Sequence, residues 1–409
     1  MKILYFSSFY SPESIAGAFR ASEHAKAWAA LGHDVTVFTG WPNYPTGRLF
    51  DGYEMTRFGE EVIDGVRVLR SASAILPNTS FANRIKSGVS FIANGWHNCM
   101  PRGSAVGSDY DVVLASSGTV FTAWLGAQYA KQKCIPLVME FRDLTWRQMI
   151  ATGGSERDPK VRAMRALELG LCSKAERVVA LTEGFGRELA SQGVSEEKLS
   201  VVPNGADLVP CAHDWGGKLR IGYFGTMGIS QDVPRTLDLA AALNRGGLLE
   251  SYALIGEGAA RASVESALAS EAYPFAELGH GVPKDELEPR YSQVHMTVVS
   301  LQRSESFSET IPSKIFQSFA RGTPVLFVGP DGEAARLVRE SGGGLALCGD
   351  DAESAGTLRT FASSDDLAER LAEMSFRAKV FMERNYTRQI LAERMLGILE
   401  SAARSHKQS

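Results

Sequence analysis

Short apolar runs alternate with amphipathic stretches along the first half of the chain. Residues 2–9, KILYFSSF, are the first such run, and residues 17–32 follow with Phe19, Ala27 and Leu31 at helical spacing before Gly32. The same alternation recurs at residues 33–40, 110–117, 119–134, 135–141, 177–182 and 183–193. Strands that alternate with helices in this way predict a parallel sheet with helices on both faces.

The alternation restarts at LRIGYFG, residues 219–225, and continues to PVLFVG, residues 324–329. Prolines and glycines gather between the two halves and make residues 203–217 the best linker candidate. We therefore predict an α/β protein with two Rossmann-like, doubly wound parallel-sheet domains, at residues 1–205 and 206–385. Ligands bind beyond the carboxyl ends of the strands in such sheets, so an interdomain cleft is the expected binding place.

Composition narrows the possible functions. The chain has 409 residues, 44% of them hydrophobic, and a net charge of -4, which gives no general attraction to nucleic acid. Its five cysteines include no CxxC pair, as is typical of a reduced compartment. No stretch reaches the roughly 18 apolar residues of a membrane span, and the amino terminus turns polar early. We expect a cytoplasmic protein that is soluble or peripheral to a membrane.

Residues 305–326, ESFSETIPSKIFQSFARGTPVL, join two apolar runs and carry candidate chemistry. Pro312 suits the first turn of a helix, and the segment before it lies at the carboxyl end of a strand. Helix amides beside Ser313 and Lys314 would suit a phosphate, whereas Glu309 would suit hydroxyl groups. That combination matches a sugar nucleotide, although a purely structural helix cap explains the same residues equally well.

Several segments, taken in order, resemble the retaining glycosyltransferases of the GT-B fold. The resemblance is to the bacterial branch that builds surface polysaccharides such as O-antigen and capsule, and it covers nearly the whole chain. Its most distinctive piece is TGWPNYPTGRLFDGY, which is similar to enzymes that transfer N-acetylated, often deoxygenated, hexosamines such as N-acetylfucosamine. The other pieces are SPESIAGAF, FRDLTW, VVALTEGFGRELASQGVSEEKLSVVPNGAD, YFGTMGISQDV, LIGEGAAR, LGHGVPKDELEPRYSQVHMTVVSL and IPSKIFQSFARGTPVL.

The resemblance implies a donor site in the second domain. The family places a glutamate, seven residues and a second glutamate before Gly-x-Pro-Val. Here Glu309 holds the first position, facing donor-sugar hydroxyls, and Gln317 replaces the second, where ribose contact should survive without charge. The loop YFGTMGISQDV lacks the family's cations, which leaves Lys314 for the diphosphate. The further donor-binding candidates are Gly225, Thr226, Gly228, Glu257, Pro312, Ser313 and Ile315. Gly225 and Gly228 could equally mark a simple turn, and Gln317 could be an exposed helix residue.

The first domain contributes three candidates. Gly17 would contact phosphate in a loop where Ala16 replaces the family's usual glycine. Arg20 would reach phosphate or acceptor, or be solvated. Asp143 of FRDLTW would lie near the reacting carbon as a catalytic or positioning group, or cap the next helix. Retention is usually explained in this family by front-face attack, in which the leaving phosphate takes the acceptor proton. The histidines show no metal spacing, so we expect no metal and no other cofactor.

The acceptor implied by the resemblance is a glycan or a polyprenyl-diphosphate-linked sugar at the inner face of the plasma membrane. Residues 76–103 mix Arg84, Lys86 and Arg102 with Phe81, Phe91 and Trp96, which suits a membrane surface or a helix with its aromatics in the core. Residues 386–409 would form a terminal helix that returns to the first domain. A sugar-nucleotide epimerase of the same fold and a non-catalytic carbohydrate-binding protein remain the alternatives.

Overall fold

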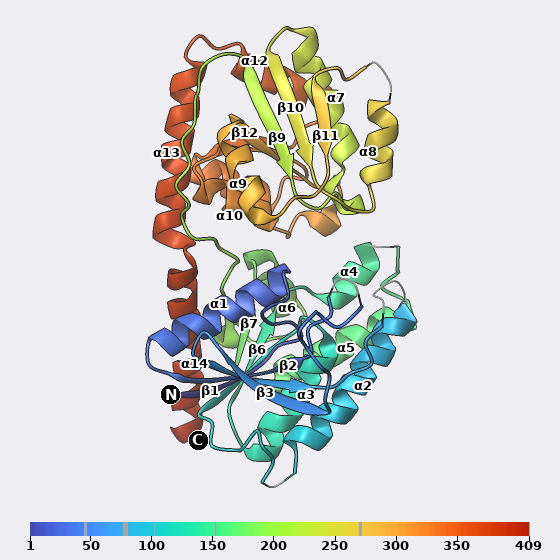
Figure 1. Ribbon diagram of the computed structural model, residues 1–409, viewed down its shortest axis with the longest axis vertical. Helices are drawn as coiled ribbons and strands as arrows, with labels where there is room; N and C mark the ends of the chain where they lie inside the picture. Colours follow the sequence, from blue (N-terminus) through green and yellow to red (C-terminus); the bar gives the residue numbers. More distant parts are fainter. Residues whose placement is uncertain (45–46, 77–80, 102, 152, 270–271, 409) are drawn as a thin grey trace. The chain divides into compact units, whose positions relative to one another are not determined.

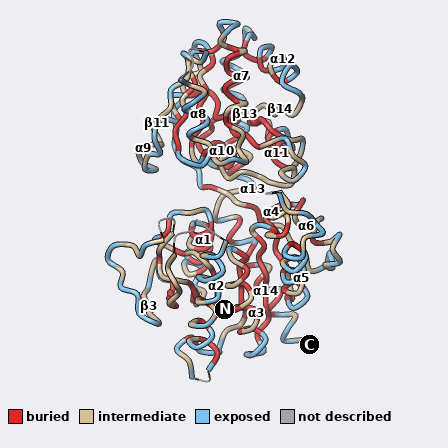
Figure 2. The backbone as a smooth tube through the Cα atoms, turned by 90° about the vertical axis from the view of Figure 1, so that its right-hand side faces the viewer, coloured by how far each residue is buried: buried red, intermediate tan, exposed pale blue. Residues whose placement is uncertain are grey.

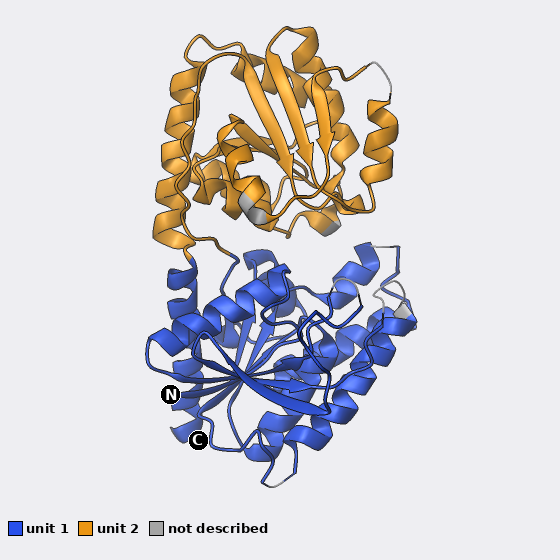
Figure 3. Ribbon diagram, viewed as in Figure 1, with its two compact units in different colours: residues 1–204, 388–409 blue, residues 205–387 orange. Residues whose placement is uncertain are grey.

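The computed structural model describes residues 1–409 except 45–46, 77–80, 102, 152, 270–271 and 409. The chain divides into two compact units, which are coloured separately in Figure 3. Unit 1 holds residues 1–204 and 388–409, and unit 2 holds residues 205–387. Residues 202–216, which contain the boundary, carry no helix or strand.

Unit 1 is built on an eight-stranded sheet (Figure 1). Its strands run in the order β3-β4-β2-β1-β5-β6-β7-β8, and all neighbours are parallel except β3 and β4. The strands are β1 Lys2–Phe6, β2 Asp34–Gly40, β3 Phe58–Ile63, β4 Val66–Ser71, β5 Val112–Ser116, β6 Leu137–Phe141, β7 Arg177–Ala180 and β8 Leu199–Val201. The helices are α1 Ala16–Ala30, α2 Phe81–Cys99, α3 Val120–Lys133, α4 Thr145–Ala151, α5 Pro159–Lys174, α6 Glu183–Ser191, η1 Glu196–Lys198 and α14 Arg388–Gln408.

Unit 2 is built on a six-stranded parallel sheet. Its order is β11-β10-β9-β12-β13-β14, so β9 is central and the chain winds outward to both sides. The strands are β9 Leu219–Phe224, β10 Leu249–Ile255, β11 Ala276–Gly279, β12 Met296–Ser300, β13 Val325–Val328 and β14 Gly344–Leu347. The helices are η2 Ile229–Gln231, α7 Val233–Arg245, α8 Arg261–Leu268, α9 Lys284–Ser292, η3 Glu305–Phe307, α10 Ser313–Ala320, α11 Glu333–Ser341, α12 Asp351–Ala362 and α13 Leu367–Asn385.

The central strands of both sheets consist mostly of buried residues, which are drawn red in Figure 2. In β1, Ile3 and Tyr5 pack into one apolar cluster while Leu4 and Phe6 pack into another, because successive side chains of a strand point to opposite faces. Helices on both faces explain why the parallel strands read as continuous apolar runs. The predicted architecture of two doubly wound α/β domains is confirmed.

The antiparallel pair β3–β4 was not among the predicted elements. Asp64 and Gly65 connect its strands with φ angles of 51° and 79°. An Asp-Gly pair with positive φ at both residues is typical of the tight turn that joins two antiparallel strands. That dipeptide was therefore an available signal.

Candidate functional site

Lys314 stands at the start of α10, on the edge of unit 2 where its parallel strands end. Helix α10 begins after Pro312, and no side chain caps it. The Lys314 Nζ donates to the Tyr223 hydroxyl at 2.5 Å and to the Thr226 carbonyl at 2.9 Å, and lies 3.8 Å from the centre of the Tyr223 ring. These contacts bring the start of α10 together with the loop that follows β9. Gly225 belongs to the same corner, because a Cβ there would lie 3.1 Å from Lys314 Cε.

The Lys314 ammonium is held by neutral groups. No ion pair involving it occurs among the residues that the structure describes. Burial lowers its pKa to about 7, since removal from water disfavours the charged form. Burial also raises the pKa of Tyr223, which keeps that hydroxyl protonated. An anion bound at this corner would therefore supply the negative counter-charge that the Lys314 ammonium lacks.

Two loops of unit 2 meet backbone to backbone beside Lys314. The Gly225 amide donates to the Ile255 carbonyl at 2.8 Å, and the Met227 amide donates to the Glu257 carbonyl at 2.8 Å. A Cβ at Gly256 would lie 1.9 Å from the Gly225 carbonyl oxygen. Gly258 has a φ of +147°, and a Cβ at this position would lie 2.4 Å from the Met227 carbonyl oxygen. The close approach of the loops thus requires both glycines of the GEG sequence, Gly256 and Gly258, a role that the sequence analysis did not predict.

The other donor-side candidates lie on α10 and on the loops around it. Glu309 is half-buried in the turn between η3 and α10, and Gln317 is exposed one turn after Lys314, on the same side of the helix. Ser313 is half-buried in the first turn. Ile315 is buried and its amide donates to the Pro312 carbonyl at 3.1 Å. The Ile315 amide is thus partly occupied, which weakens the prediction that it contacts phosphate.

Thr226, Gly228 and Glu257 occupy the two loops with different surroundings. Thr226 is exposed and its carbonyl accepts from both Lys314 and Tyr223, while Gly228 immediately precedes η2. The exposed Glu257 carboxylate accepts from His280 Nδ1 at 2.9 Å and from the Gly281 amide at 3.2 Å. These hydrogen bonds lower the pKa of Glu257, so it remains a carboxylate.

Arg20 requires a correction. It is buried, and its Nε donates to Glu140 Oε1 at 2.8 Å while its other nitrogens donate to the carbonyls of Val202 and Pro203. The ion pair holds the pKa of the buried Glu140 at about 2, although desolvation alone would raise it. With its donors engaged inside unit 1, Arg20 is neither solvated nor available to phosphate. Its role is to connect α1 to β6 and to the end of unit 1.

Gly17 and Asp143 also lie in unit 1, at the carboxyl edge of its sheet. A Cβ at Gly17 would lie 2.1 Å from the Arg142 NH1, so glycine leaves room for that guanidinium. Buried Arg142 Nε has no hydrogen-bond partner in the described part of the chain. Asp143 is exposed in the turn between β6 and α4, beside Gln148. The predicted roles of Gly17 and Asp143 stay predictions.

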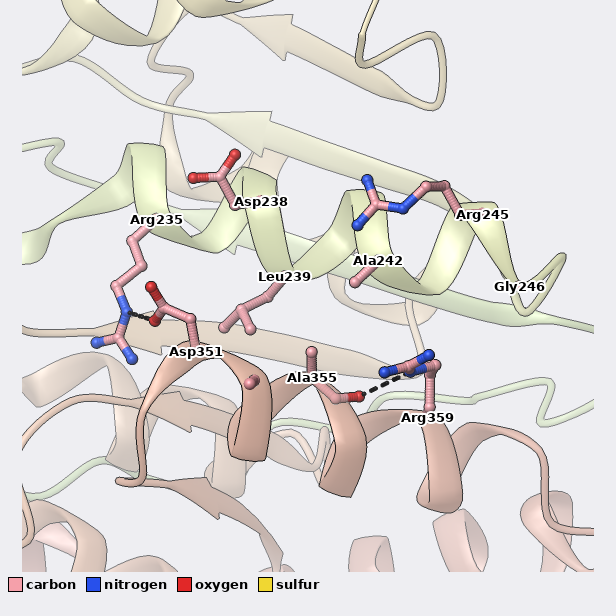
Figure 4. A pocket seen from close by; sticks show the side chains of 10 residues that line it. Arg235, Asp238, Leu239, Ala242, Arg245, Gly246, Asp351, Ala355 and Arg359 are labelled. Carbon is pink, nitrogen blue, oxygen red and sulfur yellow. Dashed lines mark hydrogen bonds and ion pairs between the residues drawn. The ribbon is translucent and has the colours of Figure 1, made fainter.

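A hollow of about 440 Å³ lies elsewhere on unit 2, between α7 and α12 (Figure 4). None of the predicted donor residues lines it. Arg235 points toward Asp351 there and bonds it at 2.8 Å, so part of the charge in the hollow is neutralised. The lining residues are Arg235, Asp238, Leu239, Ala242, Arg245, Gly246, Asp351, Ala352, Ala355 and Arg359. We therefore keep the Lys314 corner as the candidate site.

The grouping of potential metal ligands and the apolarity of the helices bear on metal binding and membrane insertion. Within the described ranges, no group of three or more His, Cys, Asp or Glu side chains is arranged to hold a metal ion. Among the described helices, none combines the length and the apolarity needed to cross a bilayer.

Known proteins are similar to both parts of the chain. Residues 17–205 match the family model of the glycosyl transferase 4-like domain. WcaI of Escherichia coli (strain K12), assigned by name to the glycosyl transferases of colanic acid biosynthesis, is 23% identical over 283 residues, 65% of this chain and 68% of that protein.

Solved structures share the whole fold. Sucrose-phosphate synthase from Thermosynechococcus elongatus aligns with a TM-score of 0.72 at 14% identity, over 98% of this chain and 99% of its own. HepE of Anabaena in complex with UDP aligns with a TM-score of 0.67 at 14% identity, over 98% of this chain and 100% of its own. These likenesses establish the architecture that surrounds the Lys314 corner.

Proposed function

We propose that the chain is a glycosyltransferase of the GT-B fold that moves a sugar from a UDP-linked donor to a glycan or lipid-linked acceptor of a cell-surface polysaccharide, with retention at the sugar carbon. The sugar is an N-acetylated or deoxygenated hexose. Support comes from the HepE structures, which hold UDP or UDP-glucose, and from the naming of WcaI for colanic acid biosynthesis. The TGWPNYPTGRLFDGY resemblance favours the hexosamine.

One observation carries this proposal: a lysine at an uncapped helix start that has no carboxylate partner within the described ranges. The Lys314 Nζ is held only by the Tyr223 hydroxyl and the Thr226 carbonyl among its hydrogen-bond partners in the described ranges. The positive end of α10 adds to its charge. A donor diphosphate bound there would accept charge-assisted hydrogen bonds, which are roughly twice as strong as neutral ones.

In the proposed reaction, the bond between the sugar carbon and the diphosphate oxygen breaks as an acceptor hydroxyl oxygen attacks from the same face. The acceptor proton passes to the departing diphosphate, so UDP and the new glycoside account for all atoms. Lys314 and the amides of the first turn of α10 stabilise the negative charge that grows on the diphosphate. Glu309 accepts hydrogen bonds from the sugar hydroxyls, and Gln317 contacts the ribose without charge.

Gly17 and Asp143 act from unit 1 in this proposal. Gly17 contacts the donor phosphate, and Asp143 orients the donor sugar or the acceptor, with Arg142 contributing charge. The positive charge at the site comes from side chains and helix amides, so the reaction does not call on a metal cofactor. The donor would also contact two loops of unit 2: the loop after β9, which contains Gly225 and Gly228, and the loop after β10, which contains Glu257.

Lys314→Ala tests the donor site. Removing one preorganised donor to a developing oxyanion typically costs about 10²–10³ in kcat, so we expect turnover to fall by that factor while UDP still binds. The measurement is the release of the nucleoside diphosphate from UDP-, GDP- and dTDP-linked sugars. Lys218→Ala, at an exposed lysine elsewhere in unit 2, is the control and should leave turnover unchanged.

The same assay discriminates the alternatives. Unchanged turnover in Lys314→Ala would remove this lysine from the mechanism. An isomerised nucleotide sugar without UDP release from the unaltered protein would indicate an epimerase. Donor binding with neither product would indicate a carbohydrate-binding protein.

We further propose that unit 1 contacts the inner face of the plasma membrane through α2. Ile85, Val89 and Trp96 are 38%, 54% and 44% exposed and fall on one side of the helix, with exposed Arg84 and Lys86 beside them. Phe91, by contrast, is 7% exposed and packs into the core. Phe91 thus has the predicted core arrangement, and the exposed stripe supports the proposed membrane contact; Arg102 lies outside the described residues.

A further inference from the structure

A buried carboxylate connects two loops at the carboxyl ends of β1 and β2. Glu13, which is 4% exposed, accepts from the amides of Asn43 and Tyr44, both at 3.0 Å to Oε1. Its Oε2 accepts from the Tyr10 amide at 3.3 Å. One side chain of the first loop thus fixes the backbone of the second loop at two consecutive residues.

Arg70 reinforces the same connection from β4. Its NH2 donates to the Ser11 carbonyl at 2.6 Å and its NH1 to the Gly40 carbonyl at 2.9 Å, while its Nε pairs with Glu61. Arg70 is 1% exposed, and Glu13 has no ion pair among the described residues. Three backbone amides, together with the charge of the nearby Arg70, compensate the burial of the Glu13 carboxylate.

Burying such a group is costly. Desolvation raises the pKa of Glu13, and the three amides act against that rise. A glutamine at this position would have a lower desolvation cost, but its single oxygen could satisfy only the Asn43 and Tyr44 amides and would leave the Tyr10 amide without an acceptor. The arrangement is therefore better explained by a need for a defined loop position than by stability alone.

The fixed loops carry a group of half-buried aromatic rings. Tyr44 meets Phe9 edge to face with 5.3 Å between ring centres, and Trp41 meets Tyr53 with 6.2 Å between centres. Trp41 Nε1 also donates to the Thr56 carbonyl at 2.9 Å, which fixes that ring. Each ring retains exposed surface at the edge of the sheet where ligands of doubly wound folds bind.

We propose that Phe9 and Tyr44 form the surface on which unit 1 binds a saccharide of the acceptor, and that Glu13 is the positioning residue that holds Tyr44 in place. A rigid aromatic ring offers an apolar face and, in tyrosine, a hydroxyl, which suits a pyranose with one face of C–H groups and a rim of hydroxyls. This inference deepens the proposed function and depends on it for the identity of the acceptor.

Saccharide binding can be measured without the natural acceptor. The probes are cellobiose and chitobiose, followed by saturation transfer from the full-length protein to the sugar C–H protons in NMR. We expect transfer with the unaltered protein, a loss of roughly tenfold in affinity for Tyr44→Ala, and retention for Tyr44→Phe, because the ring carries the contact. Phe376→Ala, at a 64% exposed ring of unit 2, should change nothing.

Glu13→Gln tests the positioning role. The amide oxygen can replace only part of the carboxylate, so we expect sugar affinity to fall while UDP affinity and UDP release without acceptor stay unchanged. Glu13→Asp, which keeps the charge, should restore part of the binding. If Glu13 were merely structural, the substitution would lower the melting temperature, UDP release and sugar binding together. That result would overturn the positioning role of Glu13.

The outcomes separate this inference from the donor proposal. No saturation transfer to either disaccharide from the unaltered protein, or equal transfer from Tyr44→Ala, would overturn the saccharide surface. Failure of the Lys314 tests with sugar binding intact would overturn the glycosyl-donor proposal and leave the saccharide surface standing.

Discussion

Lys314 titrates near neutral pH because burial lowers its pKa to about 7. An anion beside the ammonium favours its charged form, so a bound diphosphate would raise that pKa. Below pH 7 the free protein already carries the charge, and UDP binds with full affinity. As pH rises above about 7, binding must first protonate Lys314, and affinity should fall up to tenfold per pH unit until the pKa of the complex is reached.

Isothermal titration of UDP between about pH 6 and pH 9 measures this dependence. Lys314→Arg is the control, since a guanidinium stays protonated throughout and should give a nearly flat profile over the alkaline half. The phosphate of UDP titrates near pH 6 in both proteins and cancels in the comparison. Equal slopes for lysine and arginine above pH 7 would contradict the assignment.

Residue positions were predictable from the sequence where they depend on neighbours in the chain. The place of Lys314 at a helix start was predicted correctly because a strand, a proline and a helix pattern surround it within a few residues, whereas its role stays a proposal. Arg20 was assigned incorrectly because its partners are remote: Glu140 is 120 residues away and Pro203 is 183. Nothing near Arg20 in the sequence indicates that it pairs with a buried carboxylate in the folded protein.

At the scale of elements, apolar patterning predicted the central parallel strands because both of their faces are buried, but it did not predict β4 or the partly exposed β8, β11 and β14. The β3–β4 pair escaped because β3 is half-exposed and reads FGEEVI, with no long apolar run. The glycines Gly256 and Gly258 escaped for another reason. Their requirement comes from a carbonyl of the neighbouring loop, about thirty residues earlier in sequence, and a backbone contact leaves no side-chain signal.

Helix α2 provides a prediction at the same scale. Flotation with vesicles rich in anionic lipid should recover the protein, and Arg84→Ala with Lys86→Ala should weaken binding by about 2 kcal/mol, at about 1 kcal/mol for each basic residue. Val89→Asp should also reduce binding, since it places a charge in the 54% exposed apolar stripe. Phe376→Asp on α13 is the control for an exposed apolar residue elsewhere. Equal recovery of all variants would exclude α2 as the contact.

At the scale of the whole molecule, the chain leaves unit 1 after residue 204 and returns to it at residue 388. The returning helix α14 packs against α1 and the sheet: Leu399 is fully buried in the cluster that holds Ile3 and Tyr5, and Trp28 Nε1 donates to the Ala392 carbonyl at 2.8 Å. The last residues of the chain therefore belong to the core of unit 1, although residues 205–387, which separate them from the rest of unit 1 in the sequence, fold as unit 2.

Leu399→Ala should accordingly destabilise unit 1 and spare unit 2. Truncating a buried leucine costs about 2–5 kcal/mol, because apolar contact is lost and a cavity remains. Hydrogen exchange should become faster at the backbone amides of β1 and β5 in unit 1, while the amides of β9 and β10 in unit 2 keep their protection. Arg394→Ala, on the exposed side of α14, is the matched control and should leave both units unchanged. Equal loss of protection in β1 and β9 would mean that the two units unfold as one cooperative body, and unchanged protection in β1 would mean that α14 contributes little to the core it packs against.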